Sequence, residues 1–326
     1  MLEDSYGREI NYLRLAVTDR CNLRCTYCMP INGLHWLPQT ALMSYEEMER
    51  ICTLLVQMGI TKIRITGGEP FIRKGMLPFL EKLSKLKGLE KTSITTNGLL
   101  IGDFIPQLKA IGIGAINLSL DTLDENRFLK IANRKGLNKV LHTLDQLLEY
   151  DIPVKINTVA MEDQNIEDII PLVNLTKDKP ISVRFIEEMP FSGGSRTPIL
   201  NWNYKRILAH IQEEFPNIEK IQDPRHSTSL NYHIPHHKGN VGIIAAYSRL
   251  FCGDCNRIRI TPTGGMRTCL YAPPQFNLKE AMREGKSDQE LEQLLIQQIK
   301  GKPQNGWEAQ KLKKKKGQES MANIGG

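Results

Sequence analysis

Residues 14–30 read RLAVTDRCNLRCTYCMP and combine a short strand with a cluster of thiols. The strand alternates, because Arg14 falls between apolar residues, and this period-2 pattern is typical of a strand with two unlike faces. Three thiols follow within eight positions, at Cys21, Cys25 and Cys28. The stretch therefore predicts a strand whose carboxyl end leads directly into a chemically active loop.

Strand-like and helical patterns alternate through about the first 190 residues. Six strand-like runs end near Thr18, Thr66, Thr96, Leu120, Ala160 and Ile186. Helical patterns separate them, and the one over residues 44–58 begins with Ser44 and Glu47 in capping-box spacing. Strands joined by crossover helices are parallel, as in a doubly wound sheet or a barrel. A complete barrel has eight units, so six units predict an α/β fold with a partial (β/α)6 TIM-type barrel.

Charged side chains occupy one face of several strands. Lys62 and Arg64 alternate with isoleucines in KIRIT, although parallel strands are normally apolar on both faces. A half-solvated antiparallel sheet would also give this pattern, but the helices between the strands argue against it. Cations buried without carboxylates are costly, so we expect a polar lumen that binds phosphates. The expected lumen cations are Arg14, Lys62, Arg64, Lys155 and Arg184.

Glycine-rich or polar loops follow the strands at the same end as the thiols. GGEP at residues 67–70 follows the second strand, TTNG at 95–98 ends the third, and SLD at 119–121 ends the fourth. The carboxyl ends of the strands form the mouth of a barrel, where this architecture assembles active sites. We therefore expect the site at this mouth.

Composition and charge limit the class of protein. The chain has 326 residues and seven cysteines, an odd number, and its first ten residues do not resemble a signal peptide. We expect a soluble, cytoplasmic protein with reduced thiols and no membrane span. The net charge is +7, but residues 301–326 carry six lysines against two glutamates, so most of the excess lies in the tail. A dedicated nucleic-acid surface is not favoured.

Each of the two cysteine sets has three members. The spacing of Cys21, Cys25 and Cys28 suits a 4Fe-4S cluster with one iron open, and the alternative is a zinc site with a fourth ligand from elsewhere. The second set comprises Cys252, Cys255 and Cys269. For this set a zinc site remains open, with a histidine from NYHIPHH, namely His233, His236 or His237, as the fourth ligand.

The motif CNLRCTYC followed by GGEP resembles the radical S-adenosylmethionine (SAM) superfamily. The resemblance implies that Cys21, Cys25 and Cys28 hold a 4Fe-4S cluster whose open iron chelates SAM, and that reductive cleavage yields a 5'-deoxyadenosyl radical. It assigns eight residues to cofactor binding: Tyr27, Gly67, Gly68, Glu69, Thr95, Ser119, Asn157 and Met189.

The second half resembles one family within that superfamily. FCGDCNRIRITPTGGMRTCL at residues 251–270, with RFIEEM upstream and Gly325-Gly326 at the end, is similar to the GTP 3',8-cyclases of molybdenum cofactor biosynthesis. This resemblance implies that Cys252, Cys255 and Cys269 hold a second 4Fe-4S cluster facing guanine. The implied GTP-binding residues are Arg14, Lys62, Arg64, Lys155, Arg184, Arg257 and Arg259, and the implied catalytic residues are Arg257, Arg259, Gly325 and Gly326.

The same resemblance implies a reaction and a domain organisation. The radical would remove the ribose C3' hydrogen of GTP and C3' would attack C8, giving 3',8-cyclo-7,8-dihydro-GTP for a downstream cyclic pyranopterin synthase. An unidentified electron donor and a homodimer are further expectations. The barrel would occupy residues 1–230 and a small auxiliary-cluster domain residues 231–326. Two rivals are a radical enzyme that modifies peptides and a zinc-containing nucleic-acid-binding protein.

Overall fold

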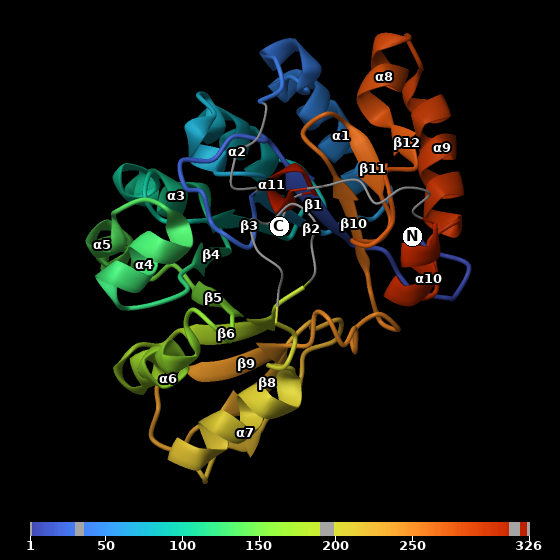
Figure 1. The fold of residues 1–326 in the computed structure, drawn as a ribbon. Coiled ribbons are helices and arrows are strands. Elements are labelled where there is room, and N and C mark those ends of the chain that lie inside the picture. The colour runs from blue at the N-terminus through green and yellow to red at the C-terminus, as the bar shows by residue number, and fades with distance from the viewer. Residues whose placement is uncertain (1, 30–35, 190–198, 313–319, 325–326) are drawn as a thin grey trace.

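The structure is a computed structural model, and it describes residues 2–29, 36–189, 199–312 and 320–324. Its centre is a row of six parallel strands that follow one another in chain order (Figure 1). They are β1 (Tyr12–Ala16), β2 (Lys62–Thr66), β3 (Lys91–Thr96), β4 (Ala115–Ser119), β5 (Val154–Ala160) and β6 (Ser182–Glu187). The strand ends confirm the six predicted strand-helix units.

Strands from the second half of the chain extend this row at both edges. β9 (Asn240–Ile244) pairs in parallel with β6, and β10 (Arg257–Ile260) pairs in parallel with β1. Antiparallel strands then complete the sheet: β8 (Leu230–His233) and β7 (Glu219–Lys220) beyond β9, and β11 (Gly265–Arg267) and β12 (Phe276–Asn277) beyond β10. The partial barrel is confirmed, whereas the domain boundary near residue 230 stays a prediction.

Helices cover the outer side of the curved sheet (Figure 1). They are α1 (Tyr45–Gln57), α2 (Met76–Ser84), α3 (Ile105–Ile111), α4 (Glu125–Ala132), α5 (Leu137–Glu149), α6 (Ile169–Asp178), α7 (Tyr204–Glu214), α8 (Leu278–Arg283) and α9 (Asp288–Lys300). A further helix, α10 (Gly306–Lys311), packs instead against Tyr271 and Ala272. The predicted capping box at Ser44 and Glu47 is present at the start of α1. None of the described helices is long and apolar enough to cross a membrane.

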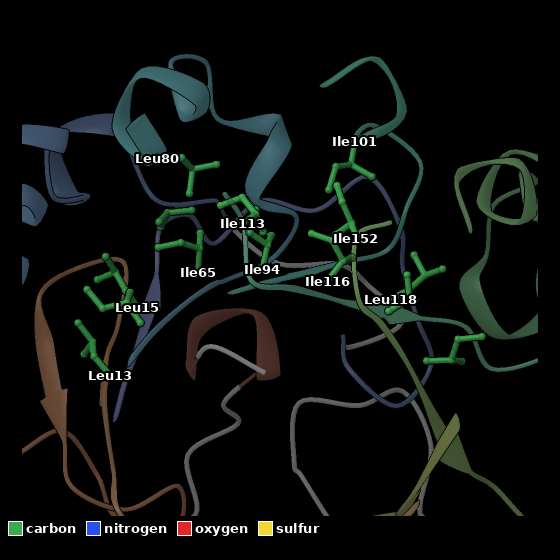
Figure 2. Close-up of a cluster of buried hydrophobic side chains, with 14 of the residues drawn as sticks. Leu13, Leu15, Ile65, Leu80, Ile94, Ile101, Ile113, Ile116, Leu118 and Ile152 are labelled. Atoms are coloured by element: carbon green, nitrogen blue, oxygen red, sulfur yellow. The ribbon is translucent and has the colours of Figure 1, made fainter. Parts of the chain in front are cut away.

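The core lies between this outer face and the helices. Figure 2 shows the cluster, in which strand residues such as Leu13 and Ile65 meet residues of helices and loops such as Leu80 and Ile152. Each such side chain is fully or almost fully buried and contributes about 1.5–3 kcal/mol. Cys52 of α1 is also buried in this core. The apolar residues of each strand therefore point outward against the helices, and the charged residues that alternate with them point to the inner face of the sheet.

Candidate active site

The inner face of the sheet lines a cavity of about 630 Å³. Both cysteine sets open into it, and we call Cys21, Cys25 and Cys28 the first thiol set and Cys252, Cys255 and Cys269 the second thiol set. Several basic side chains also line it, and we call the following members the lumen cations: Arg14, Lys62, Arg64, Lys155, Arg184, Arg257 and Arg259. The structure therefore brings together residues that lie up to 255 positions apart in the chain.

The first thiol set lies in the loop after β1. The backbone N–H groups of Cys28 and Met29 both donate to the carbonyl of Cys25, at 2.9 and 3.0 Å, so the loop turns tightly there. All three thiols are free and partly exposed. Burial raises the pKa of Cys21 to about 12, so a thiolate here requires a bound metal to stabilise its charge. Three free thiols on one cavity wall fit the donor set of an iron-sulfur cluster.

The glycines of GGEP lie directly against the first thiol loop. The N–H of Gly68 donates to the Thr18 carbonyl at 2.9 Å, and Gly67 has a φ of +134°. A Cβ at Gly68 would lie 2.1 Å from the carbonyl oxygen of Arg20, so only glycine fits. Gly67 and Gly68 line the cavity, as do five more of the residues assigned to SAM: Tyr27, Thr95, Ser119, Asn157 and Met189.

Glu69 has a different environment from the other residues assigned to SAM. Its side chain is fully buried and is absent from the described residues that line the cavity. The carboxylate accepts hydrogen bonds from the Thr96 hydroxyl at 2.9 Å and from the Asn97 N–H at 2.8 Å. Burial raises the pKa of Glu69 to about 7, although these hydrogen bonds oppose the shift. Glu69 therefore ties the GGEP loop to the end of β3, and its contact with the cofactor stays a prediction.

Tyr27 is held in place beside the first thiol set by Asp121. Its hydroxyl donates to one carboxylate oxygen of Asp121 at 2.9 Å, while the N–H of Val159 donates to the other at 2.9 Å. Burial raises the pKa of Asp121 to about 6. The Tyr27 hydroxyl is thus held by Asp121, which follows β4 and is itself bound to β5.

Strand register aligns the lumen cations in layers. Arg14 of β1 lies opposite Arg64 of β2 on one side and Arg259 of β10 on the other. Among the described residues, no carboxylate forms an ion pair with Lys62, Arg64, Lys155, Arg184 or Arg257. The lumen is therefore strongly positive and suited to a polyanion.

The crowding of these cations is visible in their pKa values. Burial, followed by the charges of Arg184 and Arg64, lowers the pKa of Lys155 to about 7. Burial and then Arg257 lower the pKa of Arg259 to about 10. A bound phosphate chain would relieve both effects because it supplies the missing negative charge.

The second thiol set comes from the opposite end of the strands. Cys252 and Cys255 precede β10, which runs parallel to β1, whereas the first thiol set follows β1. Cys269 follows β11, which is antiparallel to β10, and so returns to the same end. The pKa of Cys255 is lowered to about 6, because Lys302 and Arg257 together outweigh the strong opposing effect of burial. The two thiol sets therefore flank the cations from opposite ends.

The histidines considered as zinc ligands lie elsewhere. His233 is on β8, and the Nδ1 atom of His237 lies 2.8 Å from the Thr176 hydroxyl of α6. Neither lines the cavity within the described part of the chain, and no group of three His, Cys, Asp or Glu side chains there could hold a single metal ion. The zinc alternative gains no support from this arrangement.

Tyr12, Lys91 and Lys302 are among the cavity residues that were missing from the sequence prediction. Tyr12 and Lys91 share the inner face with Arg14 and Thr95 of their strands, so the period-2 pattern could have identified both. Lys302 lies between α9 and α10, and no local pattern in the sequence points to it.

The end of the chain returns to the cavity. α11 (Met321–Ile324) lies against β1, and Met321 lines the cavity (Figure 1). The Ser320 hydroxyl donates to the carbonyl of Cys28 at 2.8 Å, and Ser320 is 1% exposed. Gly325 and Gly326 themselves lie outside the described residues.

Comparison with known proteins places these features in a family. Residues 15–176 match the family model of the radical SAM superfamily, and residues 181–307 match the model described as Molybdenum Cofactor Synthesis C. A GTP 3',8-cyclase from Clostridium perfringens (strain 13 / Type A) is 40% identical over 93% of this chain and 94% of its own length. The mitochondrial GTP 3',8-cyclase of Arabidopsis thaliana is also 40% identical, over 93% of this chain and 78% of that protein.

Longer relatives and a solved structure extend the comparison. Human molybdenum cofactor biosynthesis protein 1 is 39% identical over 89% of this chain, which spans only 46% of that protein. The crystal structure of Streptococcus suis SuiB bound to S-adenosylmethionine shares the fold, with a TM-score of 0.62 and 17% identity over 84% of this chain and 64% of that chain. On the strength of the two family models and the matched bacterial relative, the chain belongs to the GTP 3',8-cyclase family of the radical SAM superfamily.

Proposed function

We propose that this chain is a GTP 3',8-cyclase, a lyase that converts GTP to 3',8-cyclo-7,8-dihydro-GTP as the first step of molybdenum cofactor biosynthesis. The observation that carries the proposal is a single cavity in which the lumen cations lie between two thiol sets. A nucleoside triphosphate needs a polycationic surface, and a radical reaction needs a redox group at the sugar. The lumen cations supply the first, and the thiol sets would hold the second, around one cavity of about 630 Å³.

The first thiol set would hold a 4Fe-4S cluster, and the residues at the mouth would hold SAM. Gly67 and Gly68 present backbone close to the thiol loop, and Tyr27 is fixed by Asp121. When bound, the cluster and SAM supply a 5'-deoxyadenosyl radical that removes the ribose C3' hydrogen. The lumen cations would hold GTP with its ribose toward the mouth.

The second thiol set would hold another 4Fe-4S cluster that faces the guanine base. Arg257 and Arg259 follow Cys255 on β10 and face the same lumen, so they would bind GTP between the two ends. Lys62, Arg64, Lys155 and Arg184 would hold the triphosphate across β2, β5 and β6. Charge-assisted hydrogen bonds to phosphate are among the strongest available to side chains.

The remaining assignments concern the chain end and the partners. Gly325 and Gly326 would enter the active site beside Arg257 and Arg259, an assignment supported by α11, which packs against β1 just before them. The product would pass to a cyclic pyranopterin synthase, and an electron donor would reduce the clusters. We also propose a cytoplasmic location and a homodimer.

The test is anaerobic turnover of the reconstituted protein with GTP and SAM, followed by mass analysis of the product. We expect about eight irons per chain, 5'-deoxyadenosine and the cyclised nucleotide. Replacing all three cysteines of either thiol set by alanine should remove about half of the iron and abolish cyclisation. Cys52→Ala is the matched control, because Cys52 lies in the core and should leave the iron content unchanged. Normal cyclisation without the second thiol set would refute its role.

A further inference from the structure

Lys302 is a buried lysine next to the second thiol set. It lies between α9 and α10 and is 2% exposed. Its Nζ atom donates to the backbone carbonyls of Arg257, at 2.9 Å, and of Thr268, and it lies 3.6 Å from the Sγ atom of Cys255. A lysine ammonium has three donors, so these three acceptors account for all of them.

No described carboxylate forms an ion pair with Lys302. Burying an ammonium group without a negative partner is costly, and the neighbouring Arg257 adds further positive charge. The sulfur of Cys255, 3.6 Å away, becomes negative when it ligates a metal, because the ligand form of cysteine is the thiolate. The site therefore contains a fixed cation whose only described counter-charge comes from the second thiol set.

Arg8, near the N-terminus, links the segment that carries Lys302 to the loop that carries Cys252. Arg8 donates to the carbonyl of Pro303 at 2.7 Å, to that of Gln304 at 2.7 Å and to that of Cys252 at 3.0 Å. Arg8 is itself paired with Asp4 at 2.6 Å, and both residues are buried. Lys302 is therefore held at a fixed distance from the thiols and cannot swing away as a surface lysine would.

We infer that Lys302 is a positioning residue for the second cluster, and that its ammonium stabilises the reduced state of that cluster through an N–H···S hydrogen bond to Cys255. This inference rests on the proposed function, which assigns a 4Fe-4S cluster to the second thiol set. Hydrogen bonds to the ligand sulfurs and nearby net charge are the means by which a protein sets the potential of such a cluster. Adding one electron makes the cluster more negative, so a fixed cation favours that step.

The inference can be tested in full-length protein that lacks the first thiol set. The Cys21→Ala/Cys25→Ala/Cys28→Ala variant should hold only the second cluster, which is titrated anaerobically with dithionite, a one-electron donor, and followed by electron paramagnetic resonance. In Lys302→Met on this background, the ratio of reduced to oxidised cluster at a fixed potential should fall about tenfold, equivalent to about 59 mV for a one-electron couple. Lys302→Arg keeps the charge and should shift less.

Controls separate a charge effect from damage to the fold. Lys300→Met changes an exposed lysine two positions away and should leave the potential unchanged. If Lys302→Met loses iron, Lys302→Gln, which keeps a donor without the charge, is titrated in its place. If the variant that retains iron has an unchanged reduction potential, the inference is wrong but the proposed function is unaffected. A background protein that binds no cluster overturns the proposed function and the inference with it.

Discussion

Lys155 should make GTP binding depend on pH in the neutral range. It lies on the inner face of β5, where burial and the charges of Arg184 and Arg64 lower its pKa to about 7. In water a lysine has a pKa of about 10.4. Half of the ligand-free molecules therefore carry a neutral Lys155 at pH 7, although a triphosphate would bind best to the charged form.

The size of the effect follows from the fraction that is protonated. With a pKa of about 7, this fraction falls from about one half at pH 7 to about one tenth at pH 8, so the affinity for GTP should fall roughly fivefold over that step. The affinity for GTP should fall roughly a further tenfold between pH 8 and pH 9, because bound GTP keeps Lys155 charged. At pH 8 each binding event should take up about 0.9 proton.

Calorimetry in buffers of different ionisation enthalpy measures both the affinity and the proton uptake. Lys155→Met is the control, because it should bind GTP weakly at every pH and show no uptake above pH 7. The same substitution should stabilise the ligand-free protein at pH 7, since the native state binds fewer protons at Lys155 than the unfolded state does. A GTP affinity that stays constant from pH 7 to 9, with no proton uptake, would show that Lys155 does not touch the triphosphate.

Three further predictions concern other parts of the site. Arg64→Ala should weaken GTP binding by about 1.5–3 kcal/mol, the range of one charge-assisted hydrogen bond, and leave SAM binding unchanged; equal calorimetric affinities would contradict this. Gly68→Ala should weaken SAM binding about tenfold or more, because its Cβ would lie 2.1 Å from the Arg20 carbonyl oxygen, whereas Gly301→Ala, with its nearest neighbour at 3.5 Å, should have no effect. Residues added after Gly326 should leave iron content and SAM binding intact but stop cyclisation, and a C-terminally tagged protein with full turnover would rule out a role for the tail.

The barrel and most of the site could be predicted because one physical pattern encodes both. In KIRIT the isoleucines pack outward against helices, and Lys62 and Arg64 must then point into the lumen. The same alternation extends to Lys91 and Tyr12, which share the inner face of their strands with Thr95 and Arg14. Local period-2 reasoning is reliable here because each strand is short and has one fully buried face.

Contacts between distant segments could not be predicted in this way. Lys302 meets Cys255 across 47 positions, and Arg8 meets Cys252 across 244 positions. The motif GGEP also gave no sign that the buried Glu69 carboxylate accepts hydrogen bonds from the Thr96 hydroxyl and the Asn97 N–H. These details depend on how loops pack against one another, and neither periodicity nor spacing carries that information.

The pairing of β10 with β1 contributes both to the sheet and to the candidate active site. A row of six parallel strands has two open edges, whose unpaired backbone groups must be covered. β10 covers the edge of β1, and its register sets Arg257 beside Tyr12 and Arg259 beside Arg14. Because Cys255 lies two residues before Arg257, the same pairing carries the second thiol set to the far end of the lumen. The strand that completes the sheet is therefore the strand that completes the site, so the second half of the chain is needed for both.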